Sequence, residues 1–283
     1  MVEQQASFFS SDTGYRAFTA LKWVVYGLLC LNAYLFLDEE LAALEHTFVD
    51  GFEPGQIIQV FSATIDTCAW IVLLLLFELE TSVLDDSRIQ GGVRWALHGI
   101  RYVCSAAIVY AFTGYLAELL MLYSTQPFAG DACAMLGQGI SVLVDLDDYV
   151  PLAADNCATL AAPVSQLQGF DILVPAPALD SARYLAWTDV INSGTWILVV
   201  VVLEVEVRLQ LRGRLSPGIM DATKYLKFVL YAILFVCAVY WGFEGDFVDF
   251  WDAFLWLFAF IFIELNVFEW NVETSQQAVG DND

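Results

Sequence analysis

Long, nearly uncharged apolar segments dominate this chain of 283 residues. About 20 consecutive apolar residues in an α-helix are enough to cross the ~30 Å hydrocarbon core of a bilayer. The sequence predicts six such spans, which cover about residues 17–37, 57–77, 101–123, 185–203, 225–243 and 250–268. Because apolar and polar residues do not alternate along these segments, they predict helices and not the strands of a barrel.

The overall composition favours the same class. Hydrophobic residues make up 59% of the chain and charged residues 16%, whereas soluble domains contain about 45–50% and about 25%, respectively. We therefore expect an all-α membrane protein with a single transmembrane domain over residues 1–283. The first apolar segment is not followed by a cleavage site, so we expect no signal peptide. Residues 271–283 form a short polar tail in this prediction.

The basic residues predict the orientation in the membrane. If the N-terminus is cytoplasmic, Arg183 alone of the 11 Lys and Arg residues falls on the outer side. Short cytoplasmic loops are enriched in Lys and Arg, so this orientation is the favoured one. We expect both termini in the cytoplasm and the helices in a bacterial inner membrane or a plasma membrane.

The outer side is predicted to be acidic. The formal net charge is −23, and the outer stretches 38–56 and 124–182 contain no Lys or Arg. Such a surface argues against a nucleic-acid partner, because phosphates require basic patches. Two interpretations remain: a solvated surface suited to saline surroundings, or an acidic funnel that draws cations towards a pore mouth.

Polar and Trp residues recur in register in the even-numbered spans. In each, an Asp or Asn precedes a Trp by four positions, a Glu follows that Trp by eight, and a Glu or Asn follows it by ten. These positions are Asp66, Trp70, Glu78 and Glu80; Asn192, Trp196, Glu204 and Glu206; and Asp252, Trp256, Glu264 and Asn266. The odd-numbered spans begin with a basic residue, an aromatic residue and Val, at Lys22, Arg101 and Lys227.

This self-similarity predicts three tandem two-helix repeats. They cover about residues 13–80, 92–206 and 218–270, with residues 124–184 inserted into the second repeat as an outer loop. Parallel repeats of this kind would surround a pseudo-threefold axis normal to the membrane.

The recurring residues allow two interpretations. At 100° per residue, Asp66, Trp70 and Glu80 share one helix face, and the same holds for their counterparts. In a candidate pathway, Asp66, Asn192 and Asp252 would form a polar ring that selects cations, with Trp70, Trp196 and Trp256 narrowing it and Glu80, Glu206 and Asn266 forming an inner ring. Alternatively, these stripes join neighbouring helices and have no transport role.

The cytoplasmic ends of the spans predict a layer of salt bridges. A Glu at a helix C-terminus and a Lys or Arg at a helix N-terminus both oppose the helix dipole, and pairing offsets that penalty. The expected pairs are Lys22 with Glu78 or Glu80, Arg101 with Glu204 or Glu206, and Lys227 with Glu264. Pairing between consecutive hairpins is an equal alternative.

The outer loop 124–184 is predicted to be mostly irregular, with at most short helices, because it is rich in proline. Its two cysteines, Cys133 and Cys157, predict a disulfide in an oxidising exterior. The sequence lacks a His-rich cluster, a complete calcium-binding loop, a phosphate-binding Gly loop and a nucleophile elbow. We therefore expect no metal site, no cofactor and no enzymatic activity.

Two classes of function follow. The first is a cation or proton transport protein or channel that uses intramembrane carboxylates. The alternative is a non-catalytic structural or accessory subunit of a membrane complex, which docks a protein partner through residues 124–184. We expect the protein to be surrounded by the lipid bilayer, and the sequence also allows a homo-oligomer. Convergence of Asp66, Asn192 and Asp252 on a solvated axis would favour transport, and a dry axis filled by the three Trp side chains would favour the accessory subunit.

Overall fold

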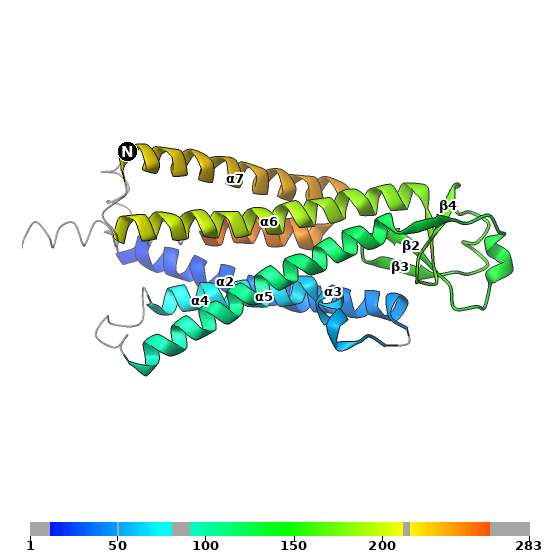
Figure 1. Cartoon of the computed structure of the whole chain (residues 1–283), viewed down its shortest axis with the longest axis horizontal. Coiled ribbons are helices and arrows are strands. Elements are labelled where there is room, and N and C mark those ends of the chain that lie inside the picture. Colours follow the sequence, from blue (N-terminus) through cyan, green and yellow to red (C-terminus); the bar gives the residue numbers. More distant parts are fainter. Residues whose placement is uncertain (1–11, 50, 81–90, 212–215, 261–283) are drawn as a thin grey trace, which may run out of the picture.

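The computed structural model describes residues 12–49, 51–80, 91–211 and 216–260. Long helices run side by side, and a small sheet lies at one end of the bundle (Figure 1). The helices are α2 (Asp12–Thr47), α3 (Ile57–Val60), α4 (Ser62–Glu78), α5 (Gly92–Tyr123), α6 (Ala176–Leu211) and α7 (Pro217–Glu244). A further helix covers residues 247–260, where the described part of the chain ends.

Several of these helices suit a membrane. Helices α2, α5, α6 and α7 contain four segments that are long and apolar enough to cross a bilayer. Residues Pro54–Val60 and Ser62–Glu78 pass the same test together, as two helices bent by 80° at a short break, the geometry of a broken span or of a re-entrant loop. The predicted span 250–268 extends past residue 260, so part of it lies outside the described residues. The described chain is therefore mostly helical, with long apolar helices compatible with membrane insertion.

The helices extend beyond the predicted spans. Helix α2 continues to Thr47, and α6 begins at Ala176, nine residues before the predicted boundary at 185. The acidic segment LDEELAALEHT does not end α2, because Leu, Ala and Glu are strong helix formers. A helix of 36 residues is roughly 54 Å long. Each of these helices is thus longer than the hydrocarbon core of a bilayer is thick.

The second predicted span is not one continuous helix. Helices α3 and α4 meet at Phe61, whose φ of −128° and ψ of 41° are not helical. Gly114 of α5 allows the close approach at this break, because a Cβ there would lie 2.5 Å from the Ile58 carbonyl oxygen and 2.8 Å from the Ser62 Cβ. Residues 56–66 contain neither Pro nor Gly, so this bend depends on tertiary contacts.

The prediction of an all-α chain with a mostly irregular outer loop is wrong at this loop. Residues 125–175 contain a five-stranded sheet in the order β1-β4-β5-β2-β3. The strands are β1 (Thr125–Pro127), β2 (Ser141–Asp145), β3 (Asp148–Pro151), β4 (Val164–Leu167) and β5 (Ile172–Pro175). Strands β2 and β5 pair in parallel, and the other pairs are antiparallel. The prolines lie at the ends of strands or next to them, where a missing N–H is tolerated.

The sheet is attached to the helix bundle by its apolar side chains. Leu143, Leu167 and Ile172 pack with Leu119 and Leu122 of α5 in one buried cluster. On the same domain, Cys133 and Cys157 form a disulfide, which confirms the predicted pairing. A 3-10 turn over Ala132–Met135 carries the first of these cysteines.

Arg183 of α6 caps the C-terminal end of α5, next to the sheet. Its guanidinium donates hydrogen bonds of 3.1 and 2.9 Å from Nε and Nη2 to the carbonyl oxygen of Leu122, in the last turn of α5. The guanidinium carbon also lies 4.5 Å from the centre of the Tyr123 ring. A cation at this position complements the negative end of the helix dipole.

Candidate functional site

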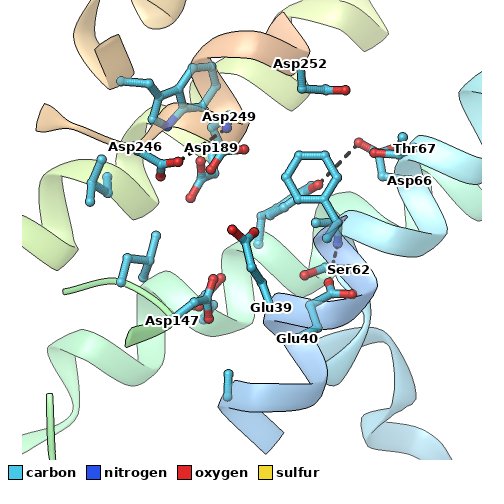
Figure 2. Close-up of a pocket in the computed structure, with 18 of the residues that line it drawn as sticks. Glu39, Glu40, Ser62, Asp66, Thr67, Asp147, Asp189, Asp246, Asp249 and Asp252 are labelled. Carbon is cyan, nitrogen blue, oxygen red and sulfur yellow. Dashed lines mark hydrogen bonds between the residues drawn. The ribbon is translucent and has the colours of Figure 1, made fainter. Parts of the chain in front are cut away.

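A cavity of about 520 Å³ lies between the helices and the β2–β3 turn. Its walls come from α2, α4, α5, α6, the end of α7 and the helix over 247–260. Figure 2 shows carboxylates from these elements gathered around one space, among them Glu39, Asp66, Asp147, Asp189 and Asp252. The cavity is thus bounded by the helix bundle on most sides and by the sheet domain on one side.

Acidic side chains line this cavity throughout. They are Glu39, Glu40, Asp66, Glu118, Asp145, Asp147, Asp148, Asp189, Glu244, Asp246, Asp249 and Asp252. Within the described part of the chain, no Lys, Arg or His belongs to the lining. Negative charges at this density attract cations into a concave, partly desolvated site and repel anions.

Asp66 lies at the deep end of the cavity and is only 8% exposed. Tyr115 of α5 donates a long hydrogen bond of 3.5 Å to its Oδ2. Its Oδ1 is buried without a hydrogen-bond partner among the described residues, and so are Asn192 Oδ1 and Ser193 Oγ of α6. Buried polar atoms of proteins are almost always paired, so unpaired acceptors mark a place where another group belongs.

The carboxyl group of Asp252 accepts a shorter hydrogen bond than that of Asp66. Its Oδ1 accepts a 3.0 Å hydrogen bond from Nδ2 of Asn32, a fully buried residue of α2. Its carboxyl group lies close enough to Asp66 for the two groups to interact electrostatically. The structure therefore brings Asp66, Asn192 and Asp252 to one cavity, although they lie far apart in the sequence.

The three equivalent Trp residues meet beneath these polar groups. The ring centroid of Trp70 lies 6.3 Å from that of Trp196 and 6.3 Å from that of Trp256. Trp196 also packs on Phe260, with centroids 4.4 Å apart. Below them, Leu29, Val199 and Leu234 fill the bundle. The indoles therefore form the floor of the cavity, and apolar packing continues behind them.

Ion pairs lie at the opposite end of the bundle from the sheet. Lys22 pairs with Glu78 in a buried bridge, Arg101 Nη2 lies 2.6 Å from Glu80 Oε2, and Lys227 Nζ lies 2.8 Å from Glu206 Oε2. Thr223 also donates a 2.5 Å hydrogen bond to Glu206.

Two of these pairs join consecutive hairpins. Arg101 does not contact Glu204 or Glu206, the partners expected first; the geometry matches the alternative of pairing between hairpins. Glu204 instead pairs with Arg208 of its own helix, at 2.7 Å. Glu264 and Asn266 lie outside the described residues. The contact of Lys227 with Glu264 therefore stays a prediction.

Several residues that line the cavity were not predicted as site residues from the sequence. Glu118 is the most important, because it is an acidic residue inside the predicted span 101–123. An ionisable residue within a span usually faces protein or water and marks a functional site, so this position alone was a usable signal. Ser193 carries no comparable signal, because serine is common in helices of membrane proteins.

The β2–β3 turn brings the sheet domain to the cavity. Asp147 adopts a positive φ of 61°, a conformation that Asp tolerates in tight turns. Its carboxyl group shares a hydrogen bond with Glu118 of α5, which requires a proton on one of the two groups. Burial raises the pKa of Asp147 and the nearby charge of Asp246 raises it further, while the hydrogen bond to Glu118 acts in the opposite direction. Burial, with the charges of Asp147 and Glu118, also holds the pKa of Tyr149 well above its usual range.

The described residues contain no group of three or more His, Cys, Asp and Glu side chains placed to hold a metal ion.

Comparisons with known proteins give no family for this chain. No protein-family model matches it, no curated protein matches it, and no solved structure matches it.

Proposed function

We propose that this protein carries cations or protons across a membrane and that the acidic cavity is the outer vestibule of its pathway. The observation that carries the proposal is the meeting of Asp66, Asn192 and Asp252 in one cavity, directly above the contact of Trp70 with Trp196 and Trp256. Rings of acidic side chains at a pore mouth select cations.

In this proposal the chain crosses the membrane six times, as three two-helix repeats around a pseudo-threefold axis. The helix over 247–260 belongs to the sixth predicted span, and both termini are cytoplasmic. The sheet then lies outside the cell or in the periplasm. Its disulfide fits that location, because disulfides persist in oxidising compartments.

The broken span supports transport over a passive structural role. Ser62, Ala63 and Asp66, in the first turns of α4, line the cavity close to the break at Phe61. Interrupted helices place backbone groups and helix ends inside a membrane, and transporters use them to build ion and substrate sites. Such irregular backbone is tolerated at membrane depth only where it is buried in protein or faces a cavity.

The Trp contact defines a closed state in this proposal. Indoles and apolar side chains seal the floor of the cavity, and the ion pairs of Lys22, Arg101 and Lys227 lie beyond them at the cytoplasmic end. Transport then requires the three indoles to separate while an ion passes.

The same Trp contact is also the observation that favours the second candidate function. A permanently sealed floor fits an accessory subunit of a membrane complex, whose sheet domain docks a protein partner. In that case the purified protein would show no flux, and a partner would be retained by residues 125–175.

Flux into proteoliposomes tests the proposal. The double variant Asp66→Asn with Asp252→Asn should abolish cation- or proton-driven dye signals while keeping the expression level and helical circular dichroism of the wild type. The matched control is Asp155→Asn, an exposed carboxylate of the sheet domain outside the cavity. Flux by the double variant at the wild-type rate would reject the pathway, and so would the absence of flux from the wild type under every cation and pH gradient.

A further inference from the structure

The deep end of the cavity contains three oxygen atoms without a partner in the described chain. They are Asp66 Oδ1, Asn192 Oδ1 and Ser193 Oγ. Asp66 is 8% exposed and Ser193 is 4% exposed, and both line the cavity. Figure 2 shows the Asp66 carboxylate at the cavity wall. Each of these oxygens can accept a hydrogen bond or coordinate a cation.

These oxygens belong to one level of the bundle. Asp66 precedes Trp70 by one helical turn, and Asn192 precedes Trp196 by one turn. Because the two indoles are in contact at 6.3 Å, the helical turns directly above them also approach each other. Ser193 follows Asn192 and lines the same cavity. The three acceptors therefore surround the deep end of the cavity, immediately above its floor.

We infer that this deep end is a binding site for one monovalent cation, held by the side-chain oxygens of Asp66, Asn192 and Ser193. The inference rests on the proposed function, because it names the ligand of the same cavity. One carboxylate with two neutral oxygens suits a single positive charge. Calcium usually requires six to eight oxygen ligands, several of them carboxylates, and the described residues contain no group of three or more His, Cys, Asp and Glu side chains placed to hold a metal ion.

The surroundings fit a cation rather than an anion or a neutral ligand. Asp252 adds a second carboxyl group near Asp66 and is held in place by its hydrogen bond from Asn32. The indoles of Trp70, Trp196 and Trp256 line the cavity below, and aromatic faces attract cations, whether alkali-metal ions or ammonium groups. Further out, the remaining carboxylates would raise the local concentration of cations.

Thermal unfolding of the full-length protein in detergent tests the site without any flux. Sodium, potassium or methylammonium chloride replaces N-methyl-D-glucamine chloride at constant ionic strength, and the melting temperature is followed by Trp fluorescence. We expect a saturable rise with at least one of the small cations. Saturation by sodium or potassium, with no effect of methylammonium, identifies an alkali-metal site; saturation by methylammonium alone identifies an ammonium site.

Variants make the test specific. Asp66→Asn and Ser193→Ala should each weaken the apparent affinity at least tenfold, and Asp155→Asn should leave it unchanged. If Asp66→Asn does not fold, Ser193→Ala alone decides. The inference is overturned if no cation gives a saturable rise in melting temperature, or if only divalent cations do. It is also overturned if Asp155→Asn weakens cation binding as much as Asp66→Asn and Ser193→Ala.

The binding experiment and the flux experiment can each give a negative result independently of the other. Saturable binding without flux keeps the cation site and rejects transport. Flux without saturable binding keeps transport and rejects the site.

Discussion

The carboxylate of Glu40 in α2 caps the first turn of α4 through Thr64. Its Oε2 accepts a 2.5 Å hydrogen bond from the Thr64 hydroxyl, and its Oε1 accepts a 2.7 Å hydrogen bond from the neighbouring amide of Ala63. The first amides of a helix have no partner within the helix, and a negative charge beside them also complements the helix dipole. A side chain distant in sequence therefore holds the break of the second span in place.

Replacing Glu40 should destabilise the protein at this break. The Glu40→Ala variant removes the hydrogen-bond acceptor of the partly buried Ala63 amide, and the loss of a helix cap typically costs about 0.5–2 kcal/mol. The measurement is the free energy of unfolding in mixed micelles. Glu45→Ala, an exposed position on the same helix, is the control and should change stability by less than about 0.5 kcal/mol. Equal effects of the two variants would mean that the cap does not stabilise the break.

The Gly114→Ala variant should be harmful because of the close contact of α5 with the broken span. The new Cβ would lie 2.5 Å from the Ile58 carbonyl oxygen, which belongs to the backbone and cannot rotate away. We expect a loss of about 1–3 kcal/mol, the usual cost of overpacking. Gly99→Ala on the same helix meets nothing within 4 Å and should be neutral or stabilising by up to about 1 kcal/mol. A Gly114→Ala protein as stable as Gly99→Ala would show that α3 and α5 do not approach this closely.

The raised pKa of Asp147 predicts a pH-dependent stability. Folding favours the protonated form of this carboxyl, so ionisation costs stability as the pH rises above the unfolded pKa of about 3.9 and through the higher folded value. The Asp147→Asn variant removes this penalty, and its amide oxygen can still accept a hydrogen bond from the protonated Glu118. Its stability relative to the wild type should therefore increase from pH 3 to pH 8 in thermal unfolding. A difference that is constant over this range, or that decreases, would contradict the assignment.

Removing an indole from the floor should increase flux if the proposed function holds. Trp70 contacts both Trp196 and Trp256, so Trp70→Leu should leave a gap in the floor and raise cation flux into proteoliposomes several-fold. Trp95→Leu is the matched control, because Trp95 is 81% exposed and lies away from the cavity. Folding of both variants is checked by circular dichroism. Equal flux in both variants would show that the Trp cluster does not limit passage.

Part of the candidate site could be predicted from the sequence. Asp66 and Trp70 lie one turn apart on one helix face, and the same spacing recurs at Asn192 and Asp252. Helical geometry alone therefore predicted which side chains would share a face, and the structure brings the three Trp residues into contact. The register of polar positions carried this information, whereas the apolar residues between them did not.

Other features depend on tertiary contacts that the sequence does not display. The strands around Leu143 and Ile172 are four or five residues long, too short for a reliable periodic pattern. The bend at Phe61 has no Pro or Gly and follows from Glu40 and Gly114. The contact of Glu118 with Asp147 joins a predicted span to a turn. Neither segment contains a sequence pattern that predicts this contact.

Arg183 has a consequence for what can approach the sheet end of the molecule. Among the Lys and Arg residues that the structure describes, it alone lies there, and its guanidinium contacts the Leu122 carbonyl oxygen and the Tyr123 ring. A phosphate headgroup or an acidic protein arriving from that side would meet carboxylates without a counter-charge to bind. Any partner that settles on this face must therefore bring its own positive charges or rely on apolar contact.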